Sequence, residues 1–377
     1  MLKRALASVF EKKVRPQKVL ILLGARRVGK TQLVNAYLAK QDPETCLHLN
    51  GDDLDDAARL KDRTVANYKR LLNNIKLLVI DEAQYIPDVG MALKLMVDHI
   101  PDLKIIATGS SSFDLAGNVG EPLVGRKNTL ILYPLSQMEL AKHENYKQSQ
   151  DMLEERLIFG GYPELEQYPD WKDKQEYLEE IVNAYLLKDI LIFEGIRQAD
   201  KILSLLKLLA FQVGSQVSVD ELGRALGISK NTAERYLDLL CKVFVIYKLP
   251  GYSRNLRKEV TKTSKWFFVD NGIRNAVIHS FGRLSQRNDV GSLWENYFAI
   301  ERKKFMAYQE RSANHFFWRT YDQQEIDLVE EENHELRAFE AKFDPNKRVK
   351  IPGAWAKAYQ QAEFNVVNRQ NFLDWVV

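Results

Sequence analysis

The sequence has little of what marks a secreted or membrane-embedded protein. It contains two cysteines in 377 residues, and Cys46 and Cys241 stand in separate apolar contexts that fit neither a disulfide framework nor a metal-binding pattern. No apolar run approaches the roughly 18 residues of a membrane helix. The apolar run near the basic start of the chain is too short for a signal peptide. We therefore expect a cytoplasmic protein without membrane partners.

The chain also has little excess of one charge sign over the other. The net charge is +3, so a nucleic-acid partner would need a local basic patch. Internal repeats are absent, and low-complexity stretches are limited to short charged loops. Hydrophobic residues make up 45% of the chain, which is enough for real cores, and the length predicts two or three domains.

One specific motif stands near the start of the chain. Gly24 and Gly29 are separated by four residues. Lys30 and Thr31 follow them, which completes the pattern of a phosphate-binding loop. An apolar run at residues 19–23 precedes the loop, and helical spacing follows it. Because strand, loop and helix are the context that this motif requires, the sequence predicts binding of ATP.

Each residue type in the loop has a chemical purpose. Glycine lets the backbone N–H groups approach a phosphate without a Cβ in the way. Lys30 would contact the terminal phosphates, and Thr31 would ligate Mg²⁺. The loop residues expected to line the nucleotide are Gly24, Arg27, Gly29, Lys30, Thr31 and Gln32.

An acidic pair ends a second apolar run, residues 77–80. Asp81 is expected to hold Mg²⁺ together with Thr31, and Glu82 to orient or deprotonate the water that attacks the γ-phosphate. A glycine turn beside an unrelated acidic strand end is the alternative.

Strands alternate with helices over the first 135 residues, which favours an α/β fold with a parallel sheet covered on both faces. Thr108 and Ser110 close one of these strands where a residue that senses the γ-phosphate would be needed. A strand-ending turn explains either residue equally well. The expected strands are residues 19–23, 45–50, 77–80, 104–110 and 129–133.

The segments GARRVGKTQL, LLVIDEAQ, IIATGSSS and EPLVGRKNTLILYPLSQMEL resemble AAA-type ATPases of bacteria and archaea whose C-terminal half is named only as a domain of unknown function. The resemblance continues through residues 160–164 and 185–190. It implies a five-stranded ATPase core, a winged helix and a restriction-endonuclease-like tail. It also implies that Arg126 contacts a γ-phosphate, in cis or across subunits of a homo-oligomer, although a local ion pair explains this arginine equally well.

We accordingly expect a P-loop NTPase sheet of AAA type followed by three smaller parts. The predicted boundaries are 1–135 for the ATPase core, 136–200 for a helical lid or connector, 201–270 for a winged helix-turn-helix and 271–377 for a restriction-endonuclease-like α/β domain.

Residues 218–237 are typical of a helix-turn-helix, because Gly227 permits the turn and Ser229 caps the second helix. Strands are expected at 243–249 and 266–269, and the basic stretch that leads to the second strand includes Lys265. A basic hairpin beside a recognition helix suits double-stranded DNA. Contact with a protein partner, or a merely solvated edge, is the alternative. The predicted DNA contacts are Lys230, Asn231, Arg235, Arg254, Arg257 and Lys258.

The last hundred residues place Asp327 on one expected strand and Glu340-x-Lys342 on the next, an order similar to the restriction-endonuclease-like nuclease core. Alternation puts Glu340 and Lys342 on one face of their strand. The two carboxylates would chelate Mg²⁺, Lys342 would activate water, and Glu295 could add a further ligand. Such a pattern is also common on solvated strands, and such a core can be inactive.

These features together predict a Mg²⁺-dependent ATPase that couples hydrolysis to DNA binding or processing. The alternative is a nucleotide-controlled regulatory switch that binds protein partners and has an inactive nuclease-like tail.

Overall fold

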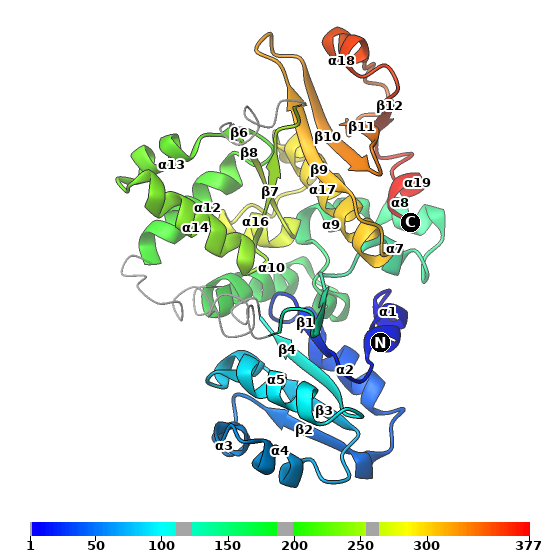
Figure 1. Ribbon diagram of the computed structural model, residues 1–377. Coiled ribbons are helices and arrows are strands. Elements are labelled where there is room, and N and C mark those ends of the chain that lie inside the picture. The colour runs from blue at the N-terminus through cyan, green and yellow to red at the C-terminus, as the bar shows by residue number, and fades with distance from the viewer. Residues whose placement is uncertain (1, 111–122, 187–198, 254–263) are drawn as a thin grey trace. The chain divides into compact units, whose positions relative to one another are not determined.

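The computed structural model describes residues 2–110, 123–186, 199–253 and 264–377, and the chain forms two compact units (Figure 1). The first consists of Met1–Tyr133 with Lys242–Phe244, and the second of Pro134–Cys241 with Val245–Val377. The division after Tyr133 lies close to the predicted end of the ATPase core at residue 135. The finer division of the C-terminal part stays a prediction.

The first unit contains a parallel sheet with the strand order β2-β3-β4-β1-β5. The middle strand β1 pairs with β4 on one side and β5 on the other. This five-stranded parallel sheet confirms the predicted α/β fold, with β5 beginning and ending two residues earlier than expected. The strands are β1 (Val19–Leu23), β2 (Cys46–Asn50), β3 (Leu77–Asp81), β4 (Lys104–Gly109) and β5 (Lys127–Ile131).

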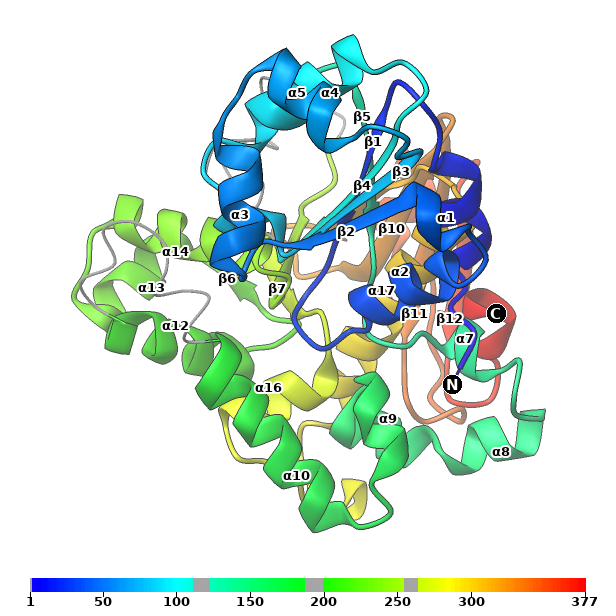
Figure 2. The ribbon, with the colours of Figure 1, turned by 90° about the horizontal axis from the view of Figure 1, so that it is seen from below.

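Helices cover both faces of this sheet. Strands β1 and β3 are buried over their whole length, as expected for central strands of a parallel sheet. Figure 2 shows α3, α4 and α5 on one side and α1 and α2 on the other. The helices are α1 (Ala7–Lys13), α2 (Lys30–Leu38), α3 (Leu54–Lys61), α4 (Val65–Leu71) and α5 (Val89–His99).

The second unit begins with the helices expected for the lid or connector. These are α7 (Gln137–Leu140), α8 (Tyr146–Asp151), α9 (Leu153–Phe159) and α10 (Trp171–Glu180), followed by a π-helical turn at Ile181–Leu186. Helix α7 begins with a capping box, because the Ser136 hydroxyl accepts from the Glu139 N–H while the Glu139 carboxylate accepts from the Ser136 N–H.

The predicted helix-turn-helix follows. Gly227 ends the first of its helices in the left-handed conformation, with φ +64°, and the Ser229 hydroxyl caps the next helix by accepting from the Thr232 N–H at 3.1 Å. The strands β6, β8 and β7 form an antiparallel sheet in that order. The elements are α12 (Ala199–Phe211), β6 (Gln216–Val217), α13 (Val219–Leu226), α14 (Lys230–Lys242), β7 (Ile246–Pro250) and β8 (Ser264–Phe268).

The tail contains a sheet flanked by helices. Its sheet runs β12-β11-β10-β9, antiparallel except for the parallel pair β11 and β12. The elements are α16 (Asn271–Val277), α17 (Val290–Tyr308), β9 (Asn314–Arg319), β10 (Glu325–Glu332), β11 (Glu335–Ala341), α18 (Gly353–Ala358), β12 (Glu363–Val367) and α19 (Leu373–Val376).

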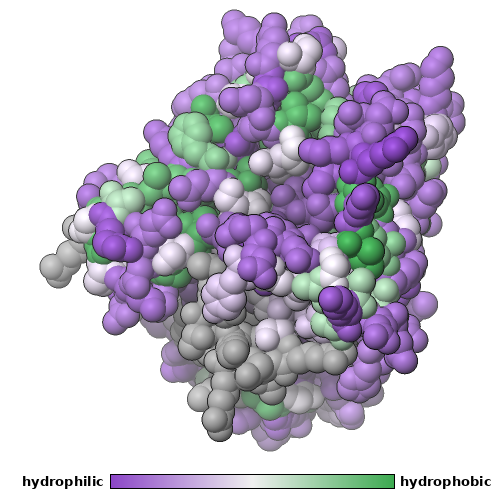
Figure 3. Space-filling view, turned by 90° about the horizontal axis from the view of Figure 1, so that it is seen from above, coloured by the Kyte–Doolittle hydropathy of each residue, from purple (hydrophilic) through white to green (hydrophobic). Residues whose placement is uncertain are grey.

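The face of the molecule seen in Figure 3 is mainly polar. Hydrophilic residues cover most of the face in Figure 3, and hydrophobic residues lie between them in small separate groups. Within the described ranges, every helix is too short or too polar to cross a membrane.

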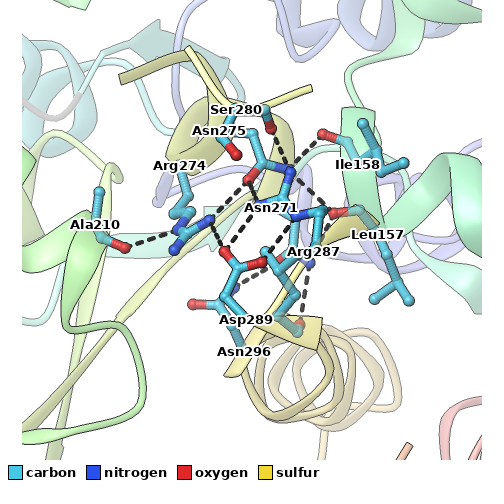
Figure 4. Close-up of polar contacts among 11 residues, drawn as sticks. Leu157, Ile158, Ala210, Asn271, Arg274, Asn275, Ser280, Arg287, Asp289 and Asn296 are labelled. Atoms are coloured by element: carbon cyan, nitrogen blue, oxygen red, sulfur yellow. Dashed lines mark hydrogen bonds and ion pairs between the residues drawn. The ribbon is translucent and has the colours of Figure 1, made fainter. Parts of the chain in front are cut away.

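A buried polar network joins the helices of the second unit (Figure 4). Arg274 on α16 donates to the Ala210 carbonyl of α12 at 2.8 Å and pairs with Asp289 at 2.6 Å. The Asn271 amide donates to the carbonyls of Leu157 on α9 and Leu293 on α17, at 3.2 and 3.1 Å. The predicted lid, helix-turn-helix and tail therefore share one set of buried hydrogen bonds.

Candidate functional site

The glycine-rich segment forms a loop between β1 and α2. Gly24 has φ +155°, and an added Cβ would lie 2.2 Å from the Leu132 carbonyl oxygen, so only glycine fits there. Gly29 precedes α2 with φ +95°. The Lys30 ammonium donates to the Gly24 and Ala25 carbonyls at 2.9 and 3.1 Å, and the residue is 5% exposed. A buried positive charge thus lies against the loop that the sequence assigned to phosphate.

Asp81 is the centre of a hydrogen-bonded set where β3 and β4 end. Its Oδ2 accepts from the Thr31 hydroxyl at 2.8 Å. Its Oδ1 accepts from the Thr108 hydroxyl and from the Glu82 N–H, the latter at 3.2 Å. Thr31 is exposed while Asp81 is buried. This pair fits Mg²⁺, because the ion takes a few protein oxygens and completes its shell with water and phosphate oxygens.

Thr108 differs from the expectation of a direct γ-phosphate sensor. The residue is fully buried, and its hydroxyl donates to the Asp81 carboxylate and accepts from the Glu82 N–H at 3.2 Å, so it can influence a phosphate only through these two residues. Ser110, 5% exposed, follows the end of β4 beside β1 and the start of the loop.

Glu82 stands next to Asp81 in a left-handed conformation with φ +49°. Its carboxylate is half-buried and accepts a hydrogen bond from the Gln84 amide. Arg27 and Gln32 are exposed on the loop and the first turn of α2, and Arg27 has φ +60°. All of these residues lie at the carboxyl edge of the parallel sheet, where ligands bind in open α/β folds.

Two arginines support the loop without any signal in the sequence. Arg4 donates to the Val28 and Tyr133 carbonyls, both at 2.6 Å, and so ties the loop to the segment after β5. Arg26 donates to the Tyr85 hydroxyl at 2.7 Å. No motif marks these residues, because each contact joins residues more than twenty positions apart.

Arg126 lies at the other edge of the sheet. It precedes β5, whose first residue pairs with Val19 at the start of β1, whereas the loop follows the end of β1. Its guanidinium pairs with Asp98 at 2.6 Å. The predicted contact with the chain's own γ-phosphate is therefore wrong in this structure, because the length of β1 separates the two sites. The local ion pair, which the sequence left open, is present.

A second cluster forms in the tail, where the structure brings the predicted residues together. Lys342 Nζ is 3.2 Å from Asp327 Oδ2 and 2.6 Å from Glu340 Oε1. Asp327 Oδ2 also accepts from the Ala341 N–H at 2.9 Å. Glu340 and Lys342 thus lie on one face of the sheet, as the alternation of side chains along a strand predicted.

The predicted Mg²⁺ site at Asp327 and Glu340 requires correction. The ammonium of Lys265, which the sequence had assigned to the basic stretch leading to the expected strand at 266–269, is 1% exposed and lies among the tail carboxylates. The described part of the chain contains no group of three or more His, Cys, Asp or Glu side chains arranged to hold a metal ion. The residues do not fit the ion, because the Lys265 and Lys342 ammonium groups already pair with Asp327 and Glu340.

The electrostatics of this cluster follow from burial. Burial by itself lowers the pKa of Lys265, but the surrounding carboxylates of Glu295, Asp327 and Glu325 outweigh it and raise that pKa above its ordinary value. Burial raises the pKa of Glu295 to about 8, against the lowering effect of Lys265. The four carboxylates of this cluster, including Glu340, share two ammonium groups, so excess negative charge also favours a proton on one of them.

The candidate DNA contacts are described only in part. Lys230, Asn231 and Arg235 are exposed on the first half of α14. Arg254, Arg257 and Lys258 lie outside the described residues.

Comparison with known proteins assigns families to three segments. Residues 16–141 match the AAA domain, residues 150–284 match a domain of unknown function (DUF8612) and residues 290–373 match another (DUF4143). The second match crosses two predicted boundaries, at residues 200 and 270.

Relatives over most of the chain carry no assigned activity. A protein of Mycobacterium tuberculosis, named as uncharacterised, is 28% identical over 86% of this chain and 70% of its own length. One of Haemophilus influenzae, named likewise, is 26% identical over 95% of this chain and 94% of its own.

Similarity to solved structures is weak. A signal transduction ATPase with numerous domains from Pyrococcus horikoshii aligns over 82% of this chain and 47% of its own, with 14% identity and a TM-score of 0.31, which is too low to carry an argument. The five-stranded sheet nevertheless agrees with the match of residues 16–141 to the AAA domain, for which nucleotide binding is expected.

Proposed function

We propose that the first unit is a Mg²⁺-dependent ATPase and that hydrolysis controls a DNA-binding C-terminal unit. The observation that carries the ATPase part is the 2.8 Å hydrogen bond between Thr31 and Asp81 beside the buried Lys30. In an enzyme of this class the metal neutralises charge on the phosphates, and the protein supplies positioning and electrostatic stabilisation.

Each residue has a role in this proposal. The Lys30 ammonium, now on the loop carbonyls, would turn to the terminal phosphates, and Thr31 and Asp81 would hold the ion. Glu82 would orient the attacking water, with its carboxylate positioned by Gln84. Thr108 would keep the Asp81 carboxylate in place through its hydroxyl. Arg126 would contact only the nucleotide of a neighbouring subunit, so this role requires the protein to form a homo-oligomer.

The ATPase proposal is tested with two variants. Lys30→Ala should abolish ATP binding, because it removes the phosphate cation, whereas Glu82→Gln should bind ATP and hydrolyse it slowly. Fluorescent-nucleotide titration and phosphate release measure the two steps. Lys40→Ala is a matched control, since this lysine is exposed and pairs with Glu11. Wild-type turnover by Glu82→Gln would refute the role given to Glu82.

The DNA part of the proposal depends on α14. Lys230, Asn231 and Arg235 are exposed on its first half, directly after the left-handed turn at Gly227, and such a helix can enter the major groove. Reversing the charge of Lys230 and Arg235 should weaken binding of duplex DNA and lower its salt slope by up to about two, one per lost phosphate contact. Lys207→Glu, a single charge reversal at an exposed lysine of α12, is the control for each of the two single variants.

One observation favours the second candidate function, a regulatory switch that binds protein partners. Lys265 lies among the tail carboxylates, which argues against DNA cleavage by the tail. ATP turnover and DNA binding measured together separate the candidates. If wild-type protein binds no duplex DNA at low salt and its turnover ignores DNA, the switch with protein partners replaces the DNA proposal.

A further inference from the structure

Lys265 carries an ammonium group that the second unit encloses. It belongs to β8, yet its Nζ is 2.7 Å from Glu295 Oε1 on α17 and 2.6 Å from Glu325 Oε1 on β10. Asp327 Oδ1 lies 3.6 Å away. A lysine on an edge facing water would leave its ammonium hydrated. The Lys265 ammonium instead links the antiparallel sheet of β6, β8 and β7 to α17 and β10 of the tail.

The ammonium stands where a divalent ion would need to bind. Carboxylate oxygens from α17 and β10 converge on it, and those of Glu295 and Glu325, at 2.7 and 2.6 Å, lie close to the roughly 2.0–2.6 Å of metal–oxygen bonds. The second oxygen of Asp327 is engaged as well, by the Lys342 ammonium at 3.2 Å and the Ala341 N–H at 2.9 Å. An ion could use these oxygens only by displacing Lys265.

The backbone is shaped around this cluster at two places. The pairing of β10 with β9 shifts between Ile326 and Val329, and an irregularity of this kind re-aims the side chain that it contains, here Asp327. Gly214 has φ +77°, and an added Cβ would lie 2.9 Å from Glu295 Oε2. The chain therefore passes closely over the carboxylate that Lys265 pairs with.

We propose that Lys265 is a tethered cation that takes the place of a divalent metal ion in the tail, locks strand β8 to α17 and β10, and keeps the carboxylate cluster closed to Mg²⁺ and Mn²⁺. Removing its charge would turn the same carboxylates into a metal site, because four acidic side chains would then share only the Lys342 ammonium. This inference does not depend on nucleotide binding by the first unit.

The test is Mn²⁺ binding to the nucleotide-free full-length protein, measured by electron paramagnetic resonance of the free ion. Wild type should show no site that depends on Asp327, and Lys265→Ala should gain one with a dissociation constant on the order of 0.1–1 mM, typical of weak oxygen-ligand sites. Lys265→Ala combined with Asp327→Asn should lose it. Lys248→Ala, which removes an exposed lysine from the paired strand β7, should behave as wild type.

Stability gives a second readout. Without metal, Lys265→Ala should melt below wild type, because buried carboxylates lose their partner. Mn²⁺ should raise its melting temperature and leave wild type unchanged. Lys265→Gln, which is also uncharged but polar, carries the same test if the alanine variant does not fold.

Two results would overturn the proposal. One is that wild-type protein binds Mn²⁺ and that Asp327→Asn abolishes this binding. This result can be obtained without any Lys265 variant. The other is a folded Lys265 variant that gains no Asp327-dependent site.

Discussion

His315 should make the stability of the second unit depend on pH in a defined window. The side chain lies on β9, is 8% exposed, and neither ring nitrogen has a hydrogen-bond partner among the described residues. Burial lowers the pKa of His315 to about 4, outweighing the attraction of Glu330, whose Oε1 is 3.7 Å from Nε2. The folded protein therefore keeps this histidine neutral where an unfolded chain would protonate it.

The direction and size of this pH dependence follow from the linkage between proton binding and unfolding. An unfolded histidine titrates near pH 6.5, so between pH 6.5 and 4 the unfolded chain binds a proton that the folded chain does not. The free energy of unfolding is unaffected above this window and falls as the pH is lowered through it. The loss is about 2 kcal/mol at pH 5 and approaches about 3 kcal/mol below pH 4.

Urea unfolding followed by tryptophan fluorescence measures this effect. All six tryptophans belong to the second unit, so the signal reports that unit. The assay compares wild type with His315→Leu at pH 7.5 and 5, and other titrating groups cancel in the difference because both proteins contain them. Wild type should lose about 2 kcal/mol more than the variant. Equal losses in the two proteins would refute the argument from burial.

Two further predictions concern single contacts. Thr108→Val removes the hydroxyl that donates to Asp81. Phosphate release should slow about 10- to 100-fold, the equivalent of one hydrogen bond to a charged group, while ATP still binds. Unchanged turnover would mean that this contact does not contribute to hydrolysis. Gly160→Ala should destabilise the second unit by at least about 2 kcal/mol, because Gly160 has φ +74° and an added Cβ would lie 2.0 Å from Asp270 Oδ1. Gly353→Ala, whose Cβ would meet nothing within 4 Å, is its control in the same urea assay, and equal curves for the two variants would contradict the steric argument.

Local patterns were sufficient for much of the fold. The alternation of apolar runs and helical segments predicted the parallel sheet, and Gly227 marked the turn between α13 and α14. Such features depend on residues adjacent along the chain, whose conformational preferences act before any tertiary contact forms. For the same reason the loop ending in Lys30 and the acidic end of β3 could be located from their neighbours alone.

Alternation also predicted one long-range group correctly. Glu340 and Lys342 had to share a face of their strand, and antiparallel pairing brought them to Asp327. The chemistry of that group could not be predicted, because it depends on a lysine from a different sheet.

What only the tertiary structure decided is which distant residues meet. Lys265 belonged by sequence to a basic stretch, but the packing of β8 against α17 and β10 buries it among carboxylates 30 or more residues away. Arg126 was expected to contact a γ-phosphate from the family resemblance, yet the strand order and direction put it at the edge away from the loop. The sequence alone determined the elements and the residues of the phosphate loop, because those depend on local geometry. The partners of buried charges were decided by packing, because burial and the alignment of strands are properties of the whole fold.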